Sequence, residues 1–347
     1  MIFAKSIPRA TSAIMTDLGL AIVPNDKDDD NNDETPTRFF RDVFLHNQDV
    51  RLHAVMDNGT RRQPDKRPMV FVHGFPELWI AWWDQLQYFA AQGHPVLALT
   101  MRGYGLSDKP EGVEHYHMDF LVGDMRAAVQ FLAHDCQVTT TTTATLQLAP
   151  LLLAHDWGAI VGWIYAKKQS QTTAQQEIAG YTAFSVPPLE TLKTNMSLNQ
   201  AWASLYMFFF NMPWLPERVF LANHAWFVGQ FMADTRSGVV PLWKLQAYRA
   251  NCLQPRAMTC MFNYYRSLLE NRDSLKRQGG GRTRLELPVL LIRGKQDGAL
   301  RGVLFQGLER FLTNFRLATL DECGHHIAAD LPKEVNAEVE SFLQTLK

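Results

Sequence analysis

Hydrophobic positions between residues 38 and 186 follow two alternating periods. Short apolar runs bounded by turn residues predict strands, and apolar side chains spaced three and four residues apart predict amphipathic helices. Strands are predicted at 38–45, 51–56, 68–72, 95–100, 148–154 and 178–184, and helices at 79–90, 121–132 and 157–168. The run 148–154 is almost entirely apolar, as a strand buried on both faces requires. This alternation predicts an α/β fold, with a parallel sheet covered by helices.

The pattern changes after Pro187. From there to about residue 275 no clear strand is predicted, but aromatic residues and helical spacings are frequent. Helices are predicted at 200–211, 225–234, 242–248 and 256–269. Strands return at 288–292 and 315–320, and a last helix carries Val335, Val339 and Phe342 on one face. A helical block between two strand-and-helix stretches predicts a lid inserted into an α/β core.

These changes divide the chain into four predicted parts. Residues 1–37 form a flexible acidic segment, because 26–36 contain six acidic residues and one lysine and cannot build a core. The first part of the α/β core occupies 38–186, and the second part occupies 281–347. The helical lid lies between them, at 187–280.

Composition excludes several classes of function. The chain has 347 residues, of which 46% are hydrophobic, and its 34 Lys and Arg against 35 Asp and Glu give a net charge of −1. No surplus of basic residues is available to neutralise a phosphate backbone, so nucleic acid is not an expected partner. The apolar runs are too short to cross a bilayer, so no transmembrane segment is expected. A monomer or a homodimer is expected.

Cysteine usage and the N-terminus bear on the compartment. The four cysteines have neither zinc-site spacing nor an obvious pairing pattern, which favours a reducing compartment and no metal. A cytoplasmic location is therefore expected. The first acidic residue, Asp17, follows Lys5 and Arg9 among small residues, which leaves an N-terminal organelle-targeting segment as the alternative.

One strand-to-helix junction carries candidate chemistry. The strand 148–154 runs into Ala154-His155-Asp156-Trp157-Gly158-Ala159 and then a helix, which is the setting of a nucleophile elbow with Asp in place of Ser. Taken alone, Asp156 could simply cap the helix. Asp297 and His325, however, follow two later strands, and nucleophile, acid and histidine is the chain order of a hydrolase triad. Asp156, Asp297 and His325 are therefore the predicted triad.

The chain resembles the α/β-hydrolase superfamily, and within it the soluble epoxide hydrolases, over residues 38–347. The matching motifs are His73-Gly74-Phe75-Pro76-Glu77, the loop at 102–108, His155-Asp156-Trp157-Gly158, the Asp297 loop and Gly324-His325. The resemblance implies the α/β-hydrolase fold, with a mostly parallel eight-stranded sheet flanked by helices and an inserted helical lid. An aspartate nucleophile restricts the implied activity to epoxide hydrolases and dehalogenases.

The lid motifs favour the epoxide hydrolases. In that family two lid tyrosines hold the epoxide oxygen, one in a Tyr-x-x-x-Phe-x-x-Pro setting and one near Asn-Trp-Tyr-Arg. Here the corresponding segments are 206–213, which begins with Tyr206, and Asn263-Tyr264-Tyr265-Arg266. By resemblance Tyr206 and Tyr265 are the pair, with Tyr264 as the competitor for the second position.

The resemblance also implies a mechanism. An epoxide and water would give a vicinal diol through a covalent ester on Asp156, which water activated by His325 and Asp297 would hydrolyse. The backbone N–H groups of Phe75 and Trp157 would form the oxyanion hole. The expected substrate is a small apolar epoxide, and neither a cofactor nor a metal is needed. The predicted pocket-lining residues are Trp202, Phe208 and His326, the last standing where the family often has Trp.

Two alternatives remain at this point. A haloalkane or haloacid dehalogenase would use the same Asp–His–Asp set, and haloalkane dehalogenases share the tryptophan after the nucleophile. Fluoroacetate-type enzymes place an arginine after the nucleophile, and residues 157–160 contain none. A receptor or scaffold with a hydrolase fold usually lacks a triad member, whereas this chain has all three.

Overall fold

The computed structural model describes residues 40–139, 148–170, 176–197, 200, 205–232, 240–270 and 284–346. The predictions for the acidic segment and for Trp202 lie outside these residues. Among the described helices, none is both long enough and apolar enough to cross a membrane.

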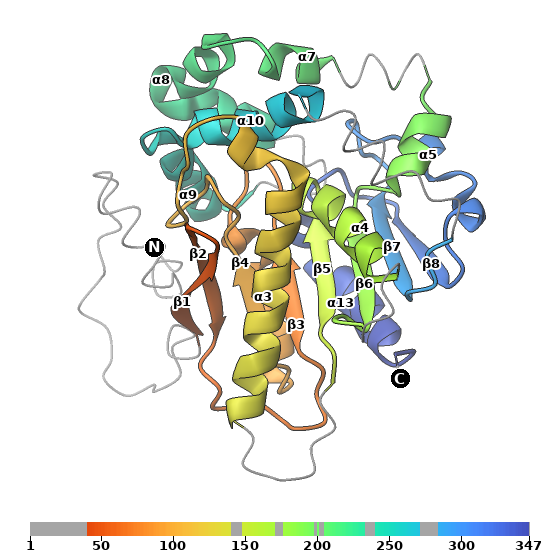
Figure 1. Cartoon of the computed structure of the whole chain (residues 1–347). Helices are drawn as coiled ribbons and strands as arrows, with labels where there is room; N and C mark the ends of the chain where they lie inside the picture. The colour runs from red at the N-terminus through yellow and green to blue at the C-terminus, as the bar shows by residue number, and fades with distance from the viewer. Residues whose placement is uncertain are drawn as a thin grey trace.

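One eight-stranded sheet forms the centre of the molecule (Figure 1). Its strands in chain order are β1 (Phe40–Asn47), β2 (Val50–Asp57), β3 (Met69–Val72), β4 (Val96–Leu99), β5 (Leu151–His155), β6 (Gly180–Phe184), β7 (Val289–Gly294) and β8 (Phe315–Leu320). Their order in the sheet is β1-β2-β4-β3-β5-β6-β7-β8. The strand β2 pairs antiparallel with β1 and β4, and every other pairing is parallel. The predicted mostly parallel eight-stranded sheet is confirmed.

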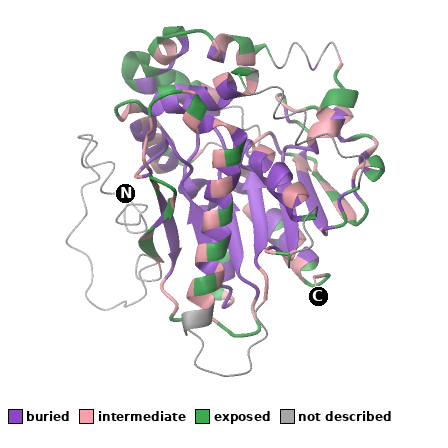
Figure 2. Ribbon diagram, viewed as in Figure 1, coloured by how far each residue is buried: buried purple, intermediate pink, exposed green. Residues whose placement is uncertain are grey.

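Helices cover both faces of the sheet. On one face, α3 (Met118–Thr139) contacts α4 (Trp157–Ser170), and α4 packs on β5 and β6. On the other, α2 (Trp83–Ala91) packs on β4 and contacts α13 (Pro332–Leu343), which reaches β7. Every residue of β3, β4, β5 and β6 is buried, as the purple strands of Figure 2 show. Burial on both faces accounts for the apolar runs of the sequence.

The observed strand β5 is shorter than the predicted strand 148–154 and lies toward its C-terminal end. It begins at Leu151 because Pro150 has no N–H to donate to a neighbouring strand. Its last residue, His155, brings the next position, Asp156, to the carboxyl edge of the sheet. Parallel α/β sheets bind their ligands at this edge.

After α5 (Leu189–Thr194), the part of the chain that the structure describes has four helices that lie over that edge (Figure 1): α7 (Tyr206–Phe210), α8 (Leu215–Met232), α9 (Leu242–Leu253) and α10 (Ala257–Glu270). The chain enters them after β6 and leaves them before β7. The helix α8 starts ten residues earlier than the predicted 225–234. Its two halves are joined by left-handed residues at Asn223, His224 and Ala225, so the helical pattern restarts there.

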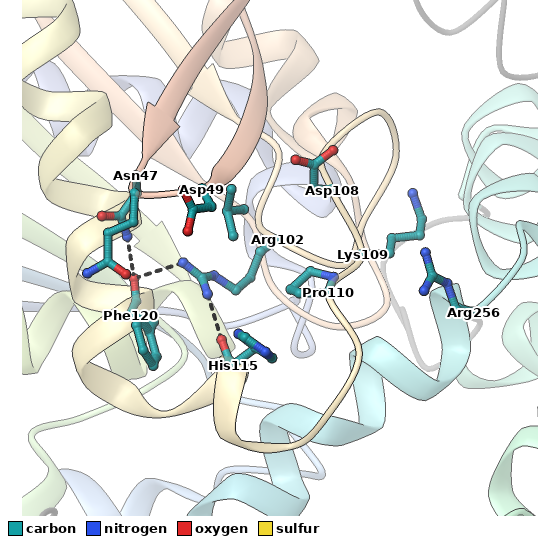
Figure 3. Close-up of a pocket in the computed structure, with 11 residues that line it drawn as sticks. Asn47, Asp49, Arg102, Asp108, Lys109, Pro110, His115, Phe120 and Arg256 are labelled. Atoms are coloured by element: carbon teal, nitrogen blue, oxygen red, sulfur yellow. Dashed lines mark hydrogen bonds between the residues drawn. The ribbon is translucent and has the colours of Figure 1, made fainter.

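A buried arginine fixes the loop after β4. The guanidinium of Arg102 donates to Asp124 of α3 through Nε at 2.5 Å and Nη2 at 2.6 Å. Both side chains are at most 5% exposed. Figure 3 shows Arg102 at a surface cavity of about 420 Å³, where it also donates to the carbonyls of His115 and Phe120. The cavity contains none of the predicted catalytic residues.

Replacing Asp124 by Ala should lower the free energy of unfolding by about 3–5 kcal/mol, because it leaves the Arg102 charge buried without its partner. Urea denaturation of the two proteins measures the difference. Glu338→Ala is the matched control, since the side chains of Arg316 and Glu338 are 41% and 33% exposed and the loss of this hydrated pair should leave stability nearly unchanged. Equal stability of the Asp124 variant and the wild type would contradict this account.

Candidate active site

Asp156 occupies a sharp turn between β5 and α4. Its φ of 48° lies in the left-handed region, which an aspartate adopts at a cost and only where the surrounding structure holds it. Gly74 packs against it so closely that a Cβ at that position would lie 2.4 Å from the Asp156 Cβ. A Cβ on Gly158 would lie 2.6 Å from the carbonyl oxygen of His73. Small residues on both sides of the turn therefore let the carboxylate stand at the sheet edge.

A hydrogen bond and an ion pair hold the Asp156 carboxylate. The backbone N–H of Phe75 donates to Oδ1 at 2.8 Å, and Nε2 of His325 lies 3.5 Å from Oδ2. Burial acts to raise the pKa of Asp156, but the hydrogen bond and charge of His325 outweigh it and hold the pKa below its usual value. The carboxylate is therefore ionised at neutral pH and free to act as a nucleophile.

His325 lies between two carboxylates. Its Nδ1 is 2.8 Å from Oδ2 of Asp297, whose Oδ1 accepts the backbone N–H groups of Ala299 and Leu300 at 2.8 Å each. Burial acts to lower the pKa of His325, yet the charges of Asp297 and Asp156 raise it well above its usual value. The structure thus brings the three predicted triad residues together, each just beyond the end of a different strand.

Two lid tyrosines face this triad. The ring of Tyr265, on α10, packs edge-on against Trp157 at 4.9 Å and Phe75 at 5.6 Å. The ring of Tyr206, on α7, lies 6.3 Å from that of Tyr265. Burial, followed by the charge of Asp156, raises the pKa of both hydroxyls, so both remain protonated and able to donate. Tyr264 points elsewhere, because its hydroxyl donates to the carbonyl of Arg102 at 2.8 Å.

A hydrogen-bonded cluster supports the triad from the core side. The Glu77 carboxylate lies 2.9 Å from Nδ1 of His155 and 3.1 Å from Nδ1 of His326, and it accepts the Gly74 N–H. Nε2 of His155 reaches the carbonyl oxygen of His325 at 2.9 Å. The cluster thereby ties Gly74, which precedes Phe75, to the backbone of His325.

The same cluster has the only metal-ligating geometry among the described residues, since one donor atom from each of Glu77, His155 and His326 lies within 4.8 Å of the others. Within the cluster, Nδ1 of each histidine already lies within hydrogen-bonding distance of the Glu77 carboxylate. Burial acts to raise the pKa of Glu77, but the two histidines hold it well below its usual value. A carboxylate with these partners needs no ion for its charge.

The prediction that Phe208 lines the pocket is wrong. Phe208 is 71% exposed, because α7 turns it outward while Tyr206 and Phe210 face the core. His326 is only 3% exposed, and its Nδ1 lies 3.1 Å from the Glu77 carboxylate, so its place in the pocket wall stays a prediction. Trp202 lies outside the described residues.

Sequence reasoning gave no role to two side chains of the site. Ser185, at the end of β6 with a φ of 63°, donates its hydroxyl to the carbonyl of His325 at 2.7 Å. Glu77 joins the cluster described above. The sequence did offer a signal for Glu77, which stands between the apolar residues Pro76 and Leu78 just after Phe75. An acid in such a setting is expected to be buried, and a buried acid is rare unless it has a partner. Ser185 offered no comparable signal.

Known proteins resemble this chain along most of its length. The sequence pattern described as "Alpha/beta hydrolase family" matches residues 69–338. Epoxide hydrolase 3 of Mus musculus is 29% identical over 285 residues, which are 80% of this chain and 71% of that protein. The AB hydrolase superfamily protein YfhM of Bacillus subtilis (strain 168) is 28% identical over 304 residues, covering 87% of this chain and 97% of that protein.

A solved structure gives the same relationship in three dimensions. The crystal structure of an epoxide hydrolase from Bacillus megaterium in complex with an inhibitor superposes with a TM-score of 0.69 at 26% identity, covering 87% of this chain and all of that one. The sequence pattern of the family spans most of the sheet and its helices, including all three residues of the triad. This chain therefore belongs to the alpha/beta hydrolase family.

Proposed function

We propose that this protein is an epoxide hydrolase, which adds water to an epoxide to give a vicinal diol. The observation that carries the proposal is the pair of protonated tyrosines, the half-buried Tyr206 and the buried Tyr265, whose hydroxyls both feel the charge of an ionised Asp156. A nucleophile on one side and two O–H donors on the other is the arrangement that opening a strained C–O bond requires. The similarity to epoxide hydrolases supports the same activity.

In the first step, Asp156 attacks a ring carbon. The new bond joins a carboxylate oxygen to that carbon, and the ring C–O bond breaks with its electron pair on the epoxide oxygen. One tyrosine delivers its proton to this oxygen while the other donates a hydrogen bond to it. Proton transfer from a positioned acid contributes about 10²–10⁴-fold to a rate. The product is a hydroxyalkyl ester of Asp156 and a tyrosinate.

Loss of the Asp156 charge prepares the second step. In the resting site that charge helps to keep His325 protonated, so its removal lowers the pKa of His325. The histidine proton then returns the tyrosinate to tyrosine and leaves a neutral imidazole, which Asp297 holds in the required tautomer. This imidazole takes a proton from water as the water attacks the ester carbonyl. The resulting tetrahedral intermediate collapses by breaking the bond between the carbonyl carbon and the diol oxygen, which takes the remaining proton of the attacking water. The diol leaves, and the carboxylate of Asp156 pairs again with protonated His325.

The ester hydrolysis passes through an oxyanion on the former Asp156 carboxylate. The Phe75 N–H already donates to Oδ1 in the resting site and would remain on that oxygen. We propose the N–H of Trp157 as the second donor, because it follows the nucleophile at the start of α4. Each such donor is worth about 2.7–4 kcal/mol in the transition state.

The aromatic side chains around Phe75 indicate the class of substrate. Phe75 lies within 6.0 Å of the rings of Phe210, Phe220, Phe231, Phe262 and Tyr265. A site bordered by these rings excludes water and favours an apolar epoxide, because binding removes the hydrocarbon surface of the epoxide from solvent. The expected substrates are therefore epoxides with aryl or alkyl substituents.

A haloalkane dehalogenase would place the same triad under halide donors, and the indole of Trp157 is one such donor. Parallel assays of diol formation from styrene oxide and of halide release from 1-bromobutane separate the two activities. Diol formation without halide release is the expected result. Halide release without diol formation would replace the proposal by dehalogenation.

Asp297→Asn should lower kcat by about 10⁴-fold, because the amide can hold His325 in the wrong tautomer and supplies no charge. The ester hydrolysis needs neutral His325, so its rate rises with pH until that histidine is deprotonated. Removing the Asp297 charge lowers the pKa of His325, so the residual activity should reach its plateau at a lower pH than in the wild type. Single-turnover rates measured across pH test the shift, and an unchanged profile would contradict the role given to Asp297.

A further inference from the structure

The outer surface of the lid is unusually apolar. Thirteen large hydrophobic side chains are exposed among the described residues, and nine of them lie between 205 and 242. We define the lid face by six of these nine: Phe208, Met212, Trp214, Leu221, Trp226 and Phe227, whose exposed fractions run from 37% to 71%. All six fall within the stretch 208–227, and large apolar side chains that a soluble protein leaves in water over one region mark binding surfaces.

Charge on this surface has one sign. Among the exposed residues of 205–232 there is no Asp or Glu, and Arg218 is the exposed cation, placed 5.0 Å over the ring of Trp214. The acid of this segment, Glu217, is turned away and paired with Arg266. Arg249, at the edge of the lid face, donates to the carbonyl of His224 at the turn within α8. An apolar surface with arginines and no exposed acid complements an anionic lipid headgroup layer.

The position and the residue types agree with that partner. Helices α7 and α8 form the outermost layer of the lid, on the side away from the sheet, and exposed positions run along them (Figures 1 and 2). Trp214 and Trp226, at 61% and 52% exposure, are the residue type that concentrates at membrane–water interfaces, where the ring is buried and the indole N–H stays hydrated.

We propose that the lid face docks on the surface of a phospholipid bilayer. The side chains of Trp214, Trp226 and Phe227 would enter the boundary between headgroups and acyl chains, with Arg218 and Arg249 on the phosphates. Docking would bring the catalytic pocket, which lies under the lid, close to the bilayer, where apolar molecules are most concentrated. That consequence rests on the proposed function, whereas the docking itself does not.

The test uses the full chain and vesicles of phosphatidylcholine containing about 30% phosphatidylglycerol, at physiological ionic strength. Wild-type protein should float with the vesicles. For a Trp214→Ser/Trp226→Ser variant, the partition coefficient onto the vesicles should be lower by about tenfold or more, because membrane affinity increases with the apolar area that is inserted. The matched control is Phe44→Ser/Tyr88→Ser, which removes two exposed aromatics from the α/β core and should bind as the wild type does.

Diol formation from a water-soluble epoxide should be equal in all three proteins, which shows that the variants fold. Brominated acyl chains should quench tryptophan fluorescence in the wild type and lose most of that effect in the Trp214→Ser/Trp226→Ser variant. Absence of vesicle binding, or equal binding by that variant, would overturn the proposal. So would a wild-type dimer in sedimentation velocity that the same variant dissociates, because a second copy would then cover the lid face.

Discussion

Replacing His325 by Gln is expected to stop the enzyme after a single chemical step. Attack by Asp156 needs no base, because an aspartate with the ordinary pKa of about 3.9 is ionised at neutral pH and the Phe75 N–H still donates to it in the variant, whereas the following attack by water needs a base. Glutamine cannot accept a proton, so turnover should fall by roughly 10⁴-fold or more. The variant should consume about one epoxide per active site and then stop. Intact-protein mass spectrometry should find the mass of the epoxide added to the protein.

Peptide mapping gives the location of that mass. The added mass is expected on the peptide that contains Asp156. Asp156→Asn in the same background is the matched control and should acquire no added mass, because an amide is not a nucleophile of this kind. A histidine variant that stays unmodified while its fold is intact would show that His325 acts before or during the opening of the epoxide.

Removing both lid hydroxyls is expected to give the second large effect. Tyr206→Phe and Tyr265→Phe should each lower the rate of ester formation, and the double variant should lose the full acid contribution, about 10²–10⁴-fold. The loss should be non-additive, because two hydroxyls that share one oxygen act as a unit. Pre-steady-state measurement of the first turnover isolates this step from ester hydrolysis.

Tyr264→Phe is the neighbouring control. Its hydroxyl donates to the carbonyl of Arg102 and not toward Asp156, so the rate of ester formation should stay within a few-fold of the wild type. If Tyr264→Phe were damaging while Tyr265→Phe had no effect, the second lid donor would be Tyr264.

Chain order was sufficient to predict which three side chains the structure brings together. Asp156, Asp297 and His325 each follow a predicted strand, and parallel strands bring their carboxyl ends to one edge whatever the exact length of each strand. The fold class followed from the same alternation. The start of β5 was placed three residues early, since a run of apolar residues does not show where its backbone begins to pair.

Side-chain direction on short helices was harder to predict. Tyr264 and Tyr265 are adjacent on α10, so a rotation of about 100° about the helix axis exchanges their roles. Phe208 was expected in the pocket for the same reason, yet the orientation of α7 exposes it. The contact between Glu77 and His326 joins residues 249 positions apart, and only the packed fold brings them together.

The covalent ester is the central claim of this account, and one labelling measurement tests it directly. Wild-type enzyme in excess over an epoxide is allowed a single turnover in ¹⁸O-water, and the diol and the peptide holding Asp156 are then analysed by mass spectrometry. Because water attacks the carbonyl carbon of the ester, the account predicts an unlabelled diol and ¹⁸O in the Asp156 carboxylate. A first-turnover diol that carries the label, with an unlabelled Asp156, would mean that water attacks the epoxide directly, and the ester mechanism would be wrong.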